Sequence, residues 1–84
     1  MYYVYVLQSL KDFSYYIGFT KNIEKRILQH NRGKSIYTKA HKPYKLITFI
    51  IVETITEARE KEKYFKNIKN AMRVIEIMGS PKTY

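Results

Sequence analysis

The stretch "YYVYVLQSLKDFSYYIGF" (residues 2–19) sets the architecture of this chain. Residues 2–9 are aromatic and β-branched, which predicts a strand, and residues 11–14 have turn chemistry before an aromatic run returns. An antiparallel hairpin is therefore expected, with Tyr3 and Tyr5 on one face of the sheet and Val4 and Val6 on the other. Gly18 near the end of the second strand indicates either a bend or a close backbone approach.

A helix is expected directly after the hairpin. Asn22 or Thr20 can cap its start, its apolar stripe faces the sheet, and Gly33 lies just beyond its end at about residue 31 as a C-cap residue. Residues 33–45 contain Gly, Ser, Pro and four lysines without a clear period. They are typical of a long basic loop, the kind of segment that often has a functional role.

The second half of the chain predicts one strand and two helices. Residues 46–53 are almost continuously apolar and predict a strand buried on both faces. Thr54 and Glu57 have capping-box spacing at the start of a long helix, and residues 71–78 predict a shorter amphipathic one. The order is β-β-α-β-α-α. We therefore expect a single α+β domain over residues 1–84, a small three-stranded sheet flanked by helices.

Composition narrows the class of protein. No apolar run approaches the roughly 20 residues of a membrane helix. The N-terminus has no basic segment followed by a small-residue cleavage site, so no signal peptide is expected. There are no cysteines, which excludes disulfides and thiol chemistry and is compatible with the cytoplasm.

The charge of the chain is +9, and it is concentrated in residues 20–45, which hold eight Lys/Arg residues and one acidic residue. Such clustering favours contact with a polyanion, and nucleic acid is the leading candidate. The alternative is a lysine-rich surface that serves solubility. The candidate nucleic-acid-binding residues are Lys21, Lys25, Arg32, Lys34, Lys39, Lys42 and Lys45.

Glu62 interrupts the apolar stripe of the long helix. The other members of that stripe are Ala58, Phe65, Ile68 and Met72. A carboxylate on the core side of a helix is costly unless it is paired or binds a metal, which favours a functional role for Glu62. The alternative is an ordinary i,i+4 ion pair with Lys66.

Arg26 and His30 are spaced i,i+4, so they share one face of the first helix. Singly, each has a simple explanation as an exposed base or a histidine favoured at a helix C-terminus. Nine tyrosines, five of them in the hairpin, would ordinarily be core or cross-strand packing. A phenol beside a cation such as Arg26 can, however, also accept or relay a proton.

These motifs together resemble the GIY-YIG endonuclease superfamily. "Tyr3-Val4-Tyr5" followed by "Tyr16-Ile17-Gly18" looks like its paired motif, and the likeness continues through "TKNIEKRILQHN", "GKSIYTKAHKPYKLI" and "TEAREKEKYFK" over roughly residues 2–70. The most similar members are small stand-alone domains related to the nuclease module of the excision-repair endonuclease C subunit. The resemblance implies a metal-dependent endonuclease that acts on nucleic acid in repair or recombination. DNA is favoured over RNA as the substrate.

The resemblance also implies an active site made of Tyr5, Tyr16, Arg26, His30 and Glu62. Glu62 would hold Mg²⁺ or Mn²⁺, and Tyr16 or His30 would act as general base with Tyr5 orienting it. Arg26 would stabilise charge on the phosphate and lower the pKa of the phenol.

The sequence departs from the family pattern at two places. Tyr3 stands where the first motif has glycine, and Phe19 stands where relatives often have a small, polar or lysine side chain. The alternative function is a non-catalytic nucleic-acid-binding module on the same fold. No membrane partner is expected. The sequence does not decide whether the protein forms a homodimer.

Overall fold

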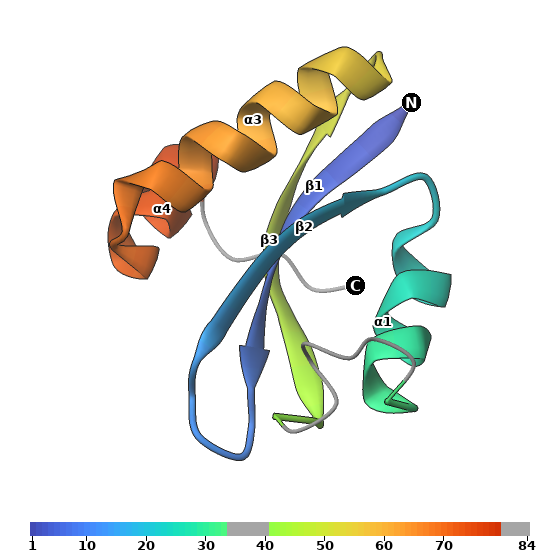
Figure 1. Ribbon diagram of the computed structural model, residues 1–84, viewed down its shortest axis with the longest axis vertical. Helices are drawn as coiled ribbons and strands as arrows, with labels where there is room; N and C mark the ends of the chain where they lie inside the picture. The colour runs from blue at the N-terminus through green and yellow to red at the C-terminus, as the bar shows by residue number, and fades with distance from the viewer. Residues whose placement is uncertain (34–40, 80–84) are drawn as a thin grey trace.

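Three antiparallel strands form the sheet of this protein, in the spatial order β2-β1-β3. The structure, a computed structural model, describes residues 1–33 and 41–79. The strands are β1 (Tyr2–Ser9), β2 (Tyr15–Thr20) and β3 (Tyr44–Val52). The helices of the described residues are α1 (Ile23–Asn31), α3 (Ile55–Ile68) and α4 (Ala71–Met78) (Figure 1). The predicted α+β class and the order β-β-α-β-α-α are confirmed.

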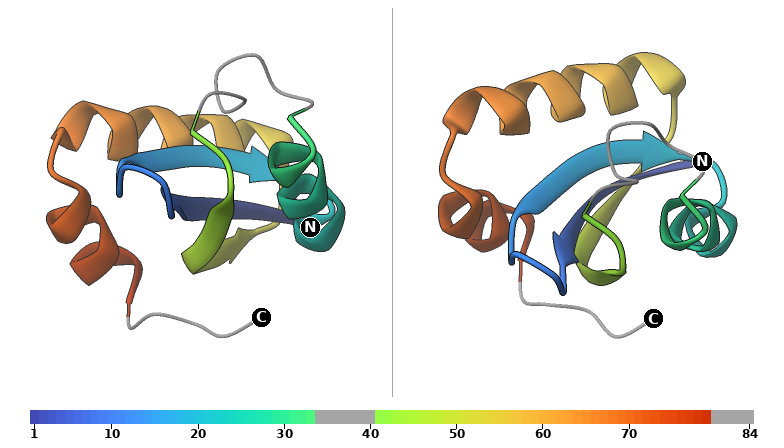
Figure 2. Two further views of the ribbon diagram at one scale, coloured as in Figure 1. Left: turned by 90° about the horizontal axis from the view of Figure 1, so that it is seen from below. Right: turned by 60° about the horizontal axis from the view of Figure 1, so that its bottom comes forward.

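Each face of the sheet has its own apolar core, because neighbouring residues of β1 point to opposite sides. Val4 and Val6 pack beneath α3 and α4, where Ala58 and Phe65 are also buried. Tyr5 and Leu7 pack on the other face with Ile23 of α1 and with Tyr44. The alternation predicted for the first strand is therefore correct, and α1 lies on the sheet face opposite to α3 and α4 (Figures 1 and 2).

The central strand is β1, and this corrects one prediction. Residues Val4 to Leu7 of β1 are at most 1% exposed, whereas Ile51 of β3 is 51% exposed. β3 pairs only with β1 within the described residues, so it lies at an edge of the sheet. The apolar run of β3 contributes to the cores on both faces, but most of its side chains are only half-buried and Ile51 is exposed, so the expected burial on both faces is met only in part. The strand also begins at Tyr44, two residues earlier than predicted.

The helix starts follow the predicted capping chemistry. The side chain of Asn22 accepts a hydrogen bond from the amide of Lys25 at 3.0 Å, and Thr54 accepts one from the amide of Glu57 at 3.2 Å. α3 ends at Ile68 because Lys69 adopts the left-handed conformation, with φ 57°. Met72 therefore belongs to α4 and is 60% exposed, so its assignment to the apolar stripe of α3 is wrong.

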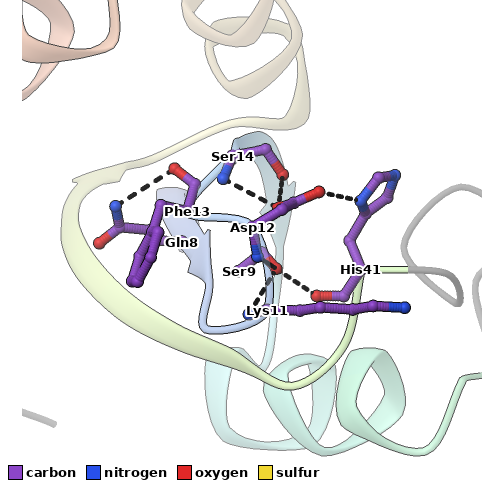
Figure 3. Close-up of polar contacts among 7 residues, drawn as sticks. All are labelled: Gln8, Ser9, Lys11, Asp12, Phe13, Ser14 and His41. Carbon is purple, nitrogen blue, oxygen red and sulfur yellow. Dashed lines mark hydrogen bonds and ion pairs between the residues drawn. The ribbon is translucent and has the colours of Figure 1, made fainter.

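A cluster of hydrogen bonds connects the hairpin turn to the segment that leads into β3 (Figure 3). The buried Ser9 hydroxyl accepts hydrogen bonds from the amides of Lys11 and Asp12 and donates one to the carbonyl oxygen of His41. Asp12 Oδ2 lies 2.6 Å from His41 Nδ1. Hydrogen bonds from Ser14 and from His41 hold the pKa of Asp12 well below its usual range.

Candidate active site

Tyr5, Arg26 and His30 form a hydrogen-bonded network on the α1 face of the sheet. The hydroxyl of Tyr5 lies 3.1 Å from His30 Nε2, and Arg26 Nε donates to the same oxygen at 3.4 Å. Arg26 also donates through a terminal nitrogen to the side-chain oxygen of Gln29 at 3.2 Å. Two residues from adjacent turns of α1 thus meet at the phenol oxygen of Tyr5, which lies more than 20 positions earlier in the chain.

The backbone register explains why the phenol of Tyr5 reaches α1. Tyr5 pairs with Gly18 across the hairpin, and its ring crosses the space where a side chain of residue 18 would lie. A Cβ on Gly18 would be 2.7 Å from the Tyr5 oxygen and 3.0 Å from the ring of Tyr16. The close approach predicted at Gly18 is therefore made by side chains, and glycine is required there because any Cβ would collide with both phenols.

Tyr16 completes the aromatic part of the cluster. Its ring centroid lies 4.9 Å from that of His30 in an edge-to-face arrangement and 6.3 Å from that of Tyr5. Burial alone would lower the pKa of Arg26, but interactions with Tyr5 and Tyr16 outweigh it and raise that pKa. The guanidinium is therefore in electrostatic contact with both phenols.

The residues of this cluster differ in their exposure to solvent, and this limits the chemical role that each can have. Tyr5 is 1% exposed and His30 is fully buried, whereas Tyr16 and Arg26 keep part of their surface in contact with solvent. Burial raises the pKa of Tyr5 to about 12, although the hydrogen bond from Arg26 opposes the rise. Arg26 therefore does lower the pKa of the Tyr5 phenol, as expected, but burial outweighs this effect and Tyr5 stays protonated at neutral pH.

His30 is neutral at pH 7. Burial and then the nearby charge of Arg26 lower the pKa of His30 to about 4. Because Arg26 donates to the Tyr5 oxygen, the phenol hydrogen is available to His30 Nε2, which as a neutral imidazole nitrogen can accept it. The buried pair can then hold or pass a proton, but neither group is in direct contact with bulk water.

Glu62 lies on α3, which packs against β1 and β2. Its side chain is 26% exposed, and Oε1 is 3.6 Å from Lys66 Nζ, so the i,i+4 ion pair considered as the alternative is present. Lys66 Nζ also lies 5.9 Å from the centroid of the Tyr16 ring. The carboxylate is thus linked through Lys66 to the aromatic cluster, and its negative charge is one of the smaller contributions to the pKa of Tyr5, after burial.

A metal ion at Glu62 would have few protein ligands. Within residues 1–33 and 41–79, no three His, Cys, Asp or Glu side chains come together as a metal-binding group. A partly exposed single carboxylate fits Mg²⁺, which keeps several waters and is often bound by one or two carboxylates plus substrate phosphates. It does not fit a cation that needs a dedicated protein cage.

The candidate nucleic-acid-binding residues are distributed unevenly around the cluster. Lys21 and Lys25 line a hollow of about 300 Å³ together with Arg26, at the start of α1. Lys42, Lys45 and Arg32 are exposed elsewhere on the surface. Lys34 and Lys39 lie outside the described residues.

Two residues of the site were not anticipated. The Tyr44 ring packs at a tilt of 57° against the His30 ring, with 5.9 Å between the ring centroids, and the Tyr44 amide donates to Asn31 Oδ1 at 2.6 Å. Tyr44 is the first residue of β3, so its position could not be read from a strand expected to begin at residue 46. Gln29 accepts a hydrogen bond from Arg26, and the only feature of the sequence that could have indicated this contact is the i,i+3 spacing of the two residues.

This network lies on a fold that matches a known catalytic domain. The family model described as "GIY-YIG catalytic domain" matches residues 1–74, which is most of the chain. The chain therefore belongs to the GIY-YIG family, whose domain is of the nuclease type, and the resemblance found in the sequence is confirmed.

Among curated proteins the chain is similar to small proteins named UPF0213. It is 48% identical over 77 residues to one from Bacillus licheniformis, covering 88% of this chain and 78% of that protein. It is 45% identical over 69 residues to one from Clostridium perfringens, covering 81% and 73%. A third, from Syntrophus aciditrophicus, is 36% identical over 81 residues, covering 94% and 92%. No solved structure matches the chain. Within the described residues no helix has the length and apolar character needed to span a bilayer.

Proposed function

We propose that this protein is a divalent-metal-dependent endonuclease that hydrolyses phosphodiester bonds in nucleic acid. DNA is favoured over RNA as its substrate. The protein would act in the cytoplasm, in DNA repair or recombination. The observation that carries the proposal is the network in which Arg26 and His30 meet at the Tyr5 oxygen, with the partly exposed Tyr16 beside them. A packing cluster would not need a buried neutral histidine against a phenol that is also bound by a guanidinium.

Of the two residues considered as general base, Tyr16 and His30, Tyr16 is the better candidate. Tyr16 is partly exposed, so a water molecule can reach its oxygen, whereas His30 is fully buried. In this scheme the phenolate of Tyr16 takes a proton from the water whose oxygen attacks phosphorus. The bond between phosphorus and the leaving sugar oxygen breaks, and that oxygen takes up a proton from solvent. Arg26 stabilises the negative charge that develops on the phosphate oxygens. Tyr5, which is itself hydrogen-bonded to His30, holds Arg26 in place from the buried side.

Glu62 would hold the metal ion, together with water and substrate phosphate. When bound there, the ion would supply charge stabilisation at the scissile phosphate and the leaving oxygen. The support for Glu62 is its partial exposure and its link to Tyr16 through Lys66. For binding of the nucleic-acid backbone, the support is the hollow with three cations at the start of α1.

A non-catalytic nucleic-acid-binding module is the second candidate. One observation favours it: Lys66 already pairs with Glu62, which partly neutralises the charge that a metal ion would need. Such a module would keep the basic surface and bind nucleic acid without turnover.

One experiment separates these functions. Purified protein is incubated with branched, nicked and linear DNA and with RNA, in Mg²⁺, in Mn²⁺ or in chelator. Glu62→Gln is compared with Glu60→Gln, a matched change at an exposed position of the same helix. The nuclease proposal expects metal-dependent cutting that Glu62→Gln abolishes and Glu60→Gln preserves. Salt-sensitive binding without any cutting would support the second candidate instead.

A further inference from the structure

A groove of about 610 Å³ runs along the outer edge of β2, between that strand and the junction of α3 and α4. Its volume is within the range of pockets that bury small ligands, roughly 300–1,000 Å³. The residues that matter for its chemistry are Tyr15, Tyr16, Phe65, Lys66, Lys69 and Ala71. Two of these, Tyr16 and Lys66, also belong to the candidate active site.

The walls of the groove combine aromatic surface with positive charge. The Tyr15 hydroxyl lies 3.9 Å from the sulfur of Met72, a contact that ties the ring to α4. Lys66 and Lys69 are both exposed, and Lys69 is held at the end of α3 by its left-handed conformation. None of the described residues that line the groove is acidic. Aromatic faces flanked by cations are the surfaces on which proteins stack nucleobases while binding the phosphates.

The groove shares Tyr16 with the cluster around Arg26. The Tyr16 ring packs against His30 at 4.9 Å, and Lys66 extends from Glu62 toward that same ring. Arg26 itself lines the hollow together with Lys21 and Lys25. A strand with its phosphates at this hollow and at Arg26 therefore brings the next nucleotide to the groove.

We propose that this groove receives the unpaired base of a nucleotide adjacent to the scissile phosphate. This deepens the proposed nuclease function, on which its place beside a cut site rests. Because a base inside a duplex is stacked and paired, only a single-stranded, frayed or extruded nucleotide can enter. The substrate class is then nucleic acid that is locally unpaired at the cut. A peptide is disfavoured as the occupant, because the lysines of the groove match a phosphate backbone.

The test measures binding in the presence of chelator, so it does not depend on turnover. The probes are a single-stranded DNA decamer with one central 2-aminopurine and a decamer of the same length made only of abasic nucleotides. Ala71→Phe fills the groove, and Ile77→Phe makes the same type of change at an exposed position of α4 outside it. Lys69→Asn removes a charge while keeping a residue that tolerates the left-handed conformation.

The unaltered protein is expected to bind the base-containing decamer roughly tenfold more tightly than the abasic one, with quenching of the 2-aminopurine fluorescence. Ala71→Phe should abolish both the preference and the quenching, and Ile77→Phe should retain them. If Ala71→Phe fails to fold by circular dichroism, Lys69→Asn decides, because it should weaken binding of both decamers and reduce the salt dependence.

Three outcomes overturn the groove proposal. These are equal affinity for the two decamers, quenching that survives Ala71→Phe, and an unaltered affinity in Lys69→Asn. Base-dependent binding with no cleavage of any substrate in Mg²⁺ would instead overturn the nuclease function and leave the groove as a nucleobase site.

Discussion

The ring of Tyr5 lies directly against the backbone of Gly18, so closely that a Cβ at residue 18 would be 2.9 Å from the ring carbon that bears the hydroxyl. This contact lets the phenol pass β2 and meet α1. It also places the hydroxyl where Arg26 and His30 both bind it.

Gly18→Ala is expected to destabilise the protein by about 1–3 kcal/mol, the usual cost of overpacking a tight site. The displaced Tyr5 should also lose its contacts with α1, and cleavage should fall. Urea unfolding measures the first effect. Combining Gly18→Ala with Tyr5→Phe removes the atom that is 2.7 Å from the new Cβ, so the double variant should lose less stability than the sum of the single changes. Additive losses would contradict the proposed collision.

Stability should depend on the protonation of His30. The pKa of His30 is about 4 in the folded protein and about 6.5 when the chain is unfolded. Between these values the unfolded chain binds more protons, so the free energy of unfolding falls as the pH is lowered. The full contribution, about 3 kcal/mol from this shift, is present above pH 6.5 and is lost as the pH falls through 4.

The comparison that isolates this effect is between the unaltered protein and His30→Gln. The difference in their unfolding free energies should shrink by that amount from pH 7 to pH 4, since the carboxylates titrate in both. An imidazole NMR titration should show the His30 resonance titrating well below pH 6.5. A His30 resonance that titrates near pH 6.5 would refute the burial argument.

Tyr16→Phe should abolish most of the proposed activity. Loss of a general base typically lowers the rate by 10²- to 10⁴-fold. The melting temperature should change little, because the ring contact with His30 at 4.9 Å is kept. Single-turnover cleavage in Mg²⁺ measures the rate, and Tyr64→Phe, at an exposed position of α3, is the control. Full activity in Tyr16→Phe would contradict the proposed role of Tyr16 as general base, because another group would then have to activate the water.

Lys66→Met should tighten binding of a divalent cation at Glu62. The ion pair at 3.6 Å competes with the metal for the carboxylate, and exposed pairs of this kind are worth up to about 1 kcal/mol, or up to roughly fivefold in affinity. Calorimetry with Mn²⁺ provides the measurement, with Lys63→Met as the control at an exposed position of the same helix. Unchanged affinity in both Lys66→Met and Glu62→Gln would remove Glu62 as the ligand.

Nucleic-acid binding should be steeply salt-dependent. Lys21 and Lys25 line the hollow beside Arg26, so replacing either by Gln should reduce the slope of log affinity against log salt by about 1. Lys61→Gln on α3, outside this hollow, is the control. Equal slopes for all three variants would show that the hollow does not bind phosphate.

Local rules were sufficient for the hairpin and the helix starts. Alternation of aromatic and β-branched residues assigns Val4 and Tyr5 to opposite faces, and Asn22 and Thr54 cap their helices because a side-chain oxygen satisfies a free amide nearby in sequence. Those rules failed where the position in the sheet mattered. The apolar run of β3 resembles that of a central strand, but only the pairing order shows that β1 occupies the centre.

The sequence alone determined the fold class, the family motifs and the five candidate residues, since these depend on spacing and on residue type. Only the tertiary structure decided which of them meet. It brings Arg26 and His30 to one oxygen of Tyr5, buries His30 completely, leaves Tyr16 partly exposed and pairs Glu62 with Lys66. The physical reason is that burial and charge proximity depend on contacts between residues up to several tens of positions apart. Those contacts set the pKa values of Tyr5 and His30, and with them the chemistry open to the site.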